Sequence, residues 1–116
     1  MSGRVKRVYD EPTKSDGRRV LVDHLWPQGL KKNEAQIDEW LKEIAPSARL
    51  RKWFGHDPAR WKEFKKKYAA ELDGQRDQVE KLAREASKRR ITLLFSAKDT
   101  EHNNAVALKE YIEKLG

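Results

Sequence analysis

The sequence ITLLF at residues 91–95 is the most continuous apolar run in the chain. Successive side chains of a strand point to opposite faces of a sheet, so a strand whose residues are apolar except for one threonine has no face suited to water. Strands buried on both faces are typical of parallel sheets that are covered by helices. The run therefore predicts a central strand of an α/β domain.

Two further strands are predicted in the N-terminal part of the chain. Residues 4–9 alternate basic and apolar side chains, with Val5, Val8 and Tyr9 as the apolar set. Residues 19–23 form an aliphatic run between turn residues. The link between the two strands, about ten residues, is short for a helical crossover. We therefore expect either antiparallel neighbours or parallel strands joined by a bare loop.

Apolar side chains at helical spacing predict about five helices. In the first, Asn33 is the expected N-cap and Pro46 ends the helix. Its apolar face consists of Ile37, Trp40, Leu41 and Ile44, at positions i, i+3, i+4 and i+7. The cap and break residues of the other helices are Ser47, Gly55, Asp57, Pro58, Asp73, Gly74, and Asp99 or Thr100. The expected fold is a single small α/β domain over residues 1–116, with about three strands, at least partly parallel, covered by these helices.

Composition restricts the chemistry and the location that we expect. The 116 residues include no cysteine, which excludes disulfides, thiolate zinc sites and cysteine nucleophiles. Metal-ligand spacings, phosphate-binding and dinucleotide-binding glycine patterns and a serine nucleophile elbow are also lacking, so neither a metal nor a cofactor is expected. Residues 1–16 are polar and no transmembrane stretch is present, so we expect a cytoplasmic protein without a membrane partner.

The formal net charge of +7 favours an anionic partner, such as a nucleic acid, a phosphorylated metabolite or an acidic protein. A basic surface also serves solubility, and that interpretation has equal weight. The densest basic stretch, at residues 60–67, is either a phosphate-binding helix face or a solvated surface. The oligomeric state stays open.

Polar residues gather where two of the predicted strands end. Parallel neighbouring strands would bring residues 23–28 and residues 98–103 to the same edge of the sheet, where open α/β sheets bind ligands. Residues 51–56 are expected to cover that edge. The candidate acid–base residues are Asp23 and His102. The candidate ligand-binding or anion-binding residues are His24, Trp26, Gln28, Lys32, Arg51, His56, Lys98 and Asn103. For Trp26 the alternatives are a lid packed over the sheet edge, which we favour, and a stacking platform for a base or sugar.

Three motifs, VLVDHLWPQGLKK, APSARLRKWFGHDP and AKDTEHNNAVAL, resemble the YeaO-like branch of domain-of-unknown-function family 488 (DUF488). The resemblance covers nearly the whole chain and implies a small bacterial or archaeal cytosolic α/β domain of uncharacterised activity. A role in nucleic-acid processing has been suggested for the wider family. The branch usually reads Asp-Arg-x-Trp-Pro-Arg-Gly, but His24 and Gln28 stand at the arginine positions here, which weakens a phosphate or carboxylate clamp. Distant members carry a cysteine where this chain has Asn103, so thiol chemistry does not transfer.

These observations leave the function open among three hypotheses. The first is an enzyme, or a degenerate relative of one, that acts on a phosphate-containing substrate such as nucleic acid. The alternative is a non-catalytic module that binds nucleic acid through its basic helical face. The third is a regulatory or interaction protein with no ligand of its own.

Overall fold

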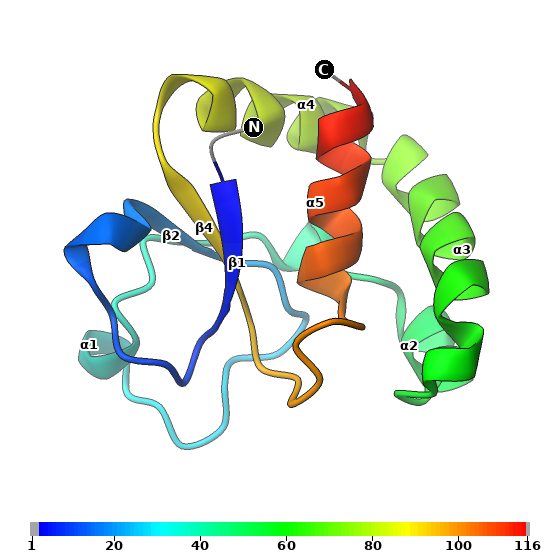
Figure 1. Ribbon diagram of the computed structural model, residues 1–116, viewed down its shortest axis with the longest axis horizontal. Helices are drawn as coiled ribbons and strands as arrows, with labels where there is room; N and C mark the ends of the chain where they lie inside the picture. Colours follow the sequence, from blue (N-terminus) through cyan, green and yellow to red (C-terminus); the bar gives the residue numbers. More distant parts are fainter. Residues whose placement is uncertain (1–2, 116) are drawn as a thin grey trace.

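Strand β4 (Ile91–Phe95) lies inside a four-stranded parallel sheet in the computed structural model, which describes residues 3–115 (Figure 1). Its neighbours are β1 (Gly3–Arg7) and β2 (Arg18–Leu21), and the short strand β3 (Glu39–Trp40) pairs with β2 at one edge of the sheet. All five residues of β4 are buried, so the prediction of a central strand covered on both faces is confirmed. Residues 1, 2 and 116 of the predicted domain lie outside the described residues.

The two N-terminal strands are parallel but are not neighbours, because β4 lies between them. The antiparallel alternative is therefore wrong, and the link between them carries only one 3-10 turn, η1 (Lys14–Asp16). Both strands end two residues earlier than expected. Each still gains one more hydrogen bond to β4, from the N–H groups of Val8 (2.8 Å) and Val22 (3.1 Å).

The predicted first helix is wrong. The structure instead has one helical turn, α1 (Lys32–Ala35), followed by β3 and by the 3-10 turn η2 (Lys42–Ile44). The N-cap is Lys31 rather than Asn33, and Gln36 ends the turn in a left-handed conformation with φ 48°.

Pairing with β2 explains why this segment is extended. The N–H of Asp38 donates to the carbonyl of Arg19 (2.8 Å), and the N–H of Leu41 donates to the carbonyl of Leu21 (2.9 Å). The apolar residues of the segment serve different faces of the sheet: Ile37 and Trp40 pack on one side, and Leu41 and Ile44 on the other. The helical spacing of these four residues therefore reflects contacts with two separate cores, not one helix face. Pairing with β2 overrides the local helical preference of the segment.

Four longer helices cover one face of the sheet: α2 (Ala48–Phe54), α3 (Trp61–Asp73), α4 (Arg76–Lys88) and α5 (Asn104–Leu115) (Figure 1). A 3-10 turn, η3 (Pro58–Arg60), precedes α3. The main core lies under these helices and includes Leu93 of β4, whereas Leu94 faces a smaller core under α1 and the loops on the opposite side. The α/β fold class is confirmed, with four strands in place of three.

Most of the predicted helix boundaries are correct. Ser47 caps α2 by accepting a hydrogen bond from the N–H of Leu50 (3.1 Å), and Gly55 ends that helix with φ 54°. Asp57 caps η3 in the same way. The expected start of the last helix at Asp99 or Thr100 is wrong, because α5 begins at Asn104.

A buried carboxylate, that of Asp16, ties the amino-terminal edge of the sheet together. It pairs with the guanidinium of Arg19 (2.5 Å), which is itself only 4% exposed, and with Lys6 and Arg4. Burial alone would raise the pKa of Asp16, but hydrogen bonds from Thr13, Lys6 and Arg19 outweigh burial and hold the pKa well below its usual range.

In the described part of the chain, no helix has the length and apolar character needed to cross a membrane.

Candidate anion-binding pocket

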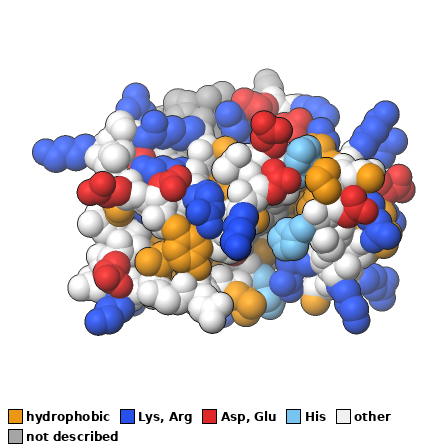
Figure 2. Space-filling view, turned by 60° about the horizontal axis from the view of Figure 1, so that its bottom comes forward, with side chains coloured by type: hydrophobic (Ala, Val, Ile, Leu, Met, Phe, Trp, Pro, Cys, Tyr) orange, Lys and Arg blue, Asp and Glu red, His pale blue; other side chains and the backbone are white. Residues whose placement is uncertain are grey.

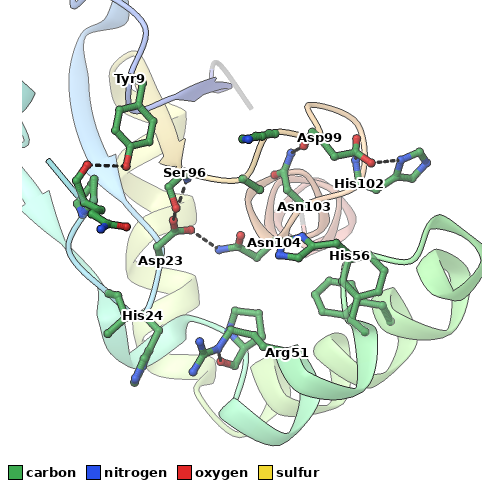
Figure 3. A pocket seen from close by; sticks show the side chains of 18 of the residues that line it. Tyr9, Asp23, His24, Arg51, His56, Ser96, Asp99, His102, Asn103 and Asn104 are labelled. Atoms are coloured by element: carbon green, nitrogen blue, oxygen red, sulfur yellow. Dashed lines mark hydrogen bonds and ion pairs between the residues drawn. The ribbon is translucent and has the colours of Figure 1, made fainter. Parts of the chain in front are cut away.

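A pocket of about 750 Å³ opens at the carboxyl edge of the sheet (Figure 3). Because β2 and β4 are parallel neighbours, as the expected site requires, the loops that follow them lie side by side. Residues of α2 and the turn after it form the opposite wall. The predicted site residues that line the pocket are Asp23, His24, Trp26, Gln28, Arg51, His56, Lys98, His102 and Asn103. Lys32 lies on α1 and is not among the lining residues.

Asp23 fastens the two strand exits to each other. One carboxylate oxygen accepts hydrogen bonds from the N–H (2.8 Å) and the hydroxyl (2.7 Å) of Ser96, directly after β4. The other accepts from Nδ2 of Asn104 (3.1 Å), the first residue of α5, and that amide also donates to the carbonyl of Val22 (2.9 Å). Both oxygens of this predicted acid–base residue are thus engaged by the protein. The sequence predicts Asn104 near the start of the last helix at this site, but it predicts neither the bond from Asn104 to Asp23 nor a role for Ser96.

His102 is held by a different carboxylate, on the side of the pocket away from Asp23 (Figure 3). Its Nδ1 lies 2.9 Å from Oδ2 of Asp99, and its ring meets the ring of Trp61 edge-on, with centroids 5.4 Å apart. The other oxygen of Asp99 accepts from the N–H groups of Glu101 and His102. The bond from Glu101, then the two from His102, lower the pKa of Asp99. The histidine is therefore oriented by Asp99, and no hydrogen bond joins it to Asp23.

Asn103 is buried and serves the start of α5. Its side-chain oxygen accepts from the N–H of Val106 (3.0 Å), and its amide group donates to the carbonyl of Asp99 (3.0 Å). This is the N-cap contact that the sequence had placed at Asp99 or Thr100. Asn103 therefore fixes the loop between β4 and α5, which forms one wall of the pocket.

Cationic side chains around the pocket have unused hydrogen-bond donors. Arg51 donates from Nε to the carbonyl of Pro46 (3.2 Å), and within residues 3–115 its terminal nitrogens have no partner. Lys98 is exposed and, in the same described range, has no hydrogen bond or ion pair. All three histidines of the chain line the pocket as well, and Figure 2 shows histidine side chains on one face together with lysine, arginine and acidic side chains. Unpaired cations beside fully engaged carboxylates suit an anionic ligand.

Aromatic side chains form the remaining wall. Trp26 donates from its indole N–H to the carbonyl of Leu30 (2.8 Å) and packs edge-on against Trp40, with centroids 5.7 Å apart. Trp26 also packs against the smaller core that contains Leu94. Tyr9, which we had placed in the first strand, lies in the turn after β1, is 40% exposed and faces the pocket.

The described residues contain no group of three or more His, Cys, Asp or Glu side chains that could hold a metal ion. The groups that line the pocket include hydrogen-bond donors, cations, aromatic rings and the oriented imidazole of His102.

Comparison with known proteins gives the family. The family model described as "Inactive DUF488-N3 subclade" matches residues 3–115. The chain is 44% identical over 115 residues to "Uncharacterized protein YeaO" of Escherichia coli K12, an alignment that covers 99% of this chain and 100% of that protein. It is 46% identical over 69 residues to "Uncharacterized protein Rv3073c" of Mycobacterium tuberculosis H37Rv, covering 60% of this chain and 58% of that protein. No solved structure matches. The resemblance seen in the sequence is thereby confirmed, and the chain belongs to the DUF488 family.

Proposed function

We propose that the protein is a non-catalytic binding module that holds a phosphate-containing ligand in the pocket at the carboxyl edge of the sheet. The main support for this proposal is which charged groups around the pocket already have hydrogen-bond partners and which do not. The carboxylates of Asp23 and Asp99 already accept hydrogen bonds on both oxygens, whereas Arg51 and Lys98 keep donors without partners in the described part of the chain. Charge-assisted hydrogen bonds from such donors are the usual means of binding phosphate.

Two observations favour binding over catalysis. A general base needs a lone pair that can reach the substrate, but Asp23 uses its oxygens to join Ser96 and Asn104. The subclade whose family model matches the chain is described as inactive. An enzyme in which the Asp99–His102 pair acts on the substrate is the alternative, and measurable turnover of a bound phosphate ester would support it instead.

Arg51 provides the sharpest test because, among the described residues, it is the one arginine that lines the pocket. Isotope-labelled protein is titrated with ribose 5-phosphate while backbone amide shifts are followed by NMR. We expect shifts at residues 23–28, 51–56 and 96–104. The Arg51→Gln variant should bind at least about tenfold more weakly, because a hydrogen bond to a charged group contributes about 1.5–3 kcal/mol.

Arg49 supplies the matched control. It lies on the same helix α2, is exposed and does not line the pocket. Arg49→Gln removes the same charge and should leave the affinity within about twofold, because an exposed charge outside the pocket is largely screened by solvent and salt. Equal loss in both variants would mean that only the overall charge matters, and the pocket proposal would then be wrong.

The second candidate function is binding of nucleic acid through the basic helical face at residues 60–67. It is tested by titrating the labelled protein with short oligonucleotides at low and high salt. Several of its cations are already in contact with aromatic rings: Arg60 and Lys67 lie over Trp53, and Lys65 lies over Trp61. Amide shifts confined to residues 60–67 that vanish in high salt would support non-specific electrostatic binding of nucleic acid and contradict the pocket proposal. Shifts in the pocket that persist in high salt would support the pocket proposal.

Cytoplasmic location stays a prediction from the sequence.

A further inference from the structure

The pocket gathers the exposed apolar side chains as well as the cations. Among residues 3–115, the large hydrophobic side chains that are exposed are Tyr9 (40%) and Leu25 (66%), and both line this pocket. Exposed apolar side chains are common when they are scattered, but their convergence at one concave site marks a binding surface. A ligand that were only a small anion would leave both of them unused.

The ring of Tyr9 is held in place before any ligand arrives. Its hydroxyl donates to the carbonyl of Gln28 (2.9 Å), at one side of the pocket (Figure 3). The guanidinium of Arg7 lies over one face of the ring, 5.2 Å from the centroid, and donates to the carbonyls of Ala97 (3.0 Å) and Ser96 (3.3 Å). Because the ring is fixed from both directions, little side-chain entropy is lost when a partner stacks on it.

We propose that the ligand joins a planar ring to a phosphate group, and that it is a nucleotide whose base stacks on Tyr9. This inference rests on the proposed function and names the ligand class of the same pocket. Arg7 already covers one face of the Tyr9 ring, so the base takes the other face and Leu25 contacts its edge. The phosphate reaches Arg51 and Lys98 across the pocket, whose volume of about 750 Å³ is in the range of small-molecule sites.

The test compares two probes that share a ribose and a phosphate, of which only one carries a base. Adenosine 5′-monophosphate and ribose 5-phosphate are titrated by calorimetry into the wild-type protein, Tyr9→Ala and Tyr9→Phe. We expect the nucleotide to bind the wild type about tenfold more tightly than ribose 5-phosphate, as stacking of one base on an aromatic ring predicts. Tyr9→Ala should abolish that difference and leave the affinity for ribose 5-phosphate unchanged. Tyr9→Phe keeps the ring and should keep the difference.

The outcomes separate this inference from the function on which it rests. Equal affinity of the wild type for both probes would overturn the nucleotide assignment and leave the phosphate pocket standing. Binding of neither probe would overturn both proposals. A Tyr9→Ala variant that loses affinity for both probes equally would show that Tyr9 only supports the loop, and would also overturn the stacking role. The NMR spectrum of each variant serves as the control for its fold.

Discussion

Replacing Asp23 with asparagine separates a structural role of this side chain from a chemical one. The new amide oxygen can still accept from Ser96, but the amide nitrogen must face Nδ2 of Asn104, which is also a donor. Asn104 cannot relieve this contact by turning its amide over, because the same Nδ2 donates to the carbonyl of Val22. The variant therefore places two donors against each other at the junction of β2 and α5.

The geometry sets the size of the effect. Loss of the charge weakens the bonds from Ser96 by about 1 kcal/mol, and a part-buried donor without an acceptor costs about 1–3 kcal/mol more. We expect the free energy of unfolding to fall by about 2–4 kcal/mol, which corresponds to a decrease in Tm of about 8 °C or more for a domain of this size. Urea unfolding, followed by tryptophan fluorescence, measures the change.

A double-mutant cycle with Asn104→Ala assigns the cost to this contact. Once Asn104 is truncated, the opposing donor is gone, and Asp23→Asn should cost at least about 1 kcal/mol less than it does in the wild type. The affinity for ribose 5-phosphate should follow the folded fraction only. An Asp23→Asn variant that is as stable as the wild type but no longer binds would refute the reasoning, because Asp23 would then act on the ligand.

Two further predictions concern the rest of the fold. Asp16→Asn leaves the buried guanidinium of Arg19 without its counter-ion and should cost about 3–5 kcal/mol in urea unfolding. Because folding lowers the pKa of Asp16, the stability that the ionised carboxylate contributes is complete above its ordinary pKa of 3.8 and is lost as the pH falls below that value. The wild type should therefore lose more stability than the variant between pH 7 and pH 3. A parallel loss of stability in both proteins would contradict this prediction. Tyr68→Phe removes the buried hydroxyl that donates to the carbonyl of Ile44 (2.6 Å) and should cost about 1–2 kcal/mol, whereas an unchanged urea midpoint would argue against that bond.

The parts of the fold that the sequence predicted well are those whose contacts repeat locally. A nearly continuous apolar run, interrupted by Thr92 alone, indicated β4, and the regular spacing of Val79, Leu82 and Ala86 indicated α4. β3 could not be predicted in this way, because its two residues are extended only through pairing with β2, and nothing in its local sequence distinguishes it from a helix.

For the candidate site too, the location could be predicted from the sequence, but the contacts inside it could not. Its location followed from one topological expectation, that the strands ending near Asp23 and before Lys98 are parallel neighbours, and the structure has that pairing. The bonds inside the site could not be foreseen, because Asp23 and Ser96 are 73 residues apart in the chain. The alternating pattern predicts Tyr9 as an apolar strand residue, but β1 ends at Arg7, and Tyr9 lines the pocket.

The two edges of the sheet have a consequence for the behaviour of the protein at high concentration. Exposed strand edges are templates on which a second chain can add its own strand. At one edge β3 offers only two residues, too few for a stable intermolecular ladder. At the other, β1 carries Arg4, Lys6 and Arg7 within five residues, so a second copy that aligned there would bring like charges together. Within the described residues, the short β3 and the basic β1 therefore both oppose edge-to-edge aggregation of an open parallel sheet.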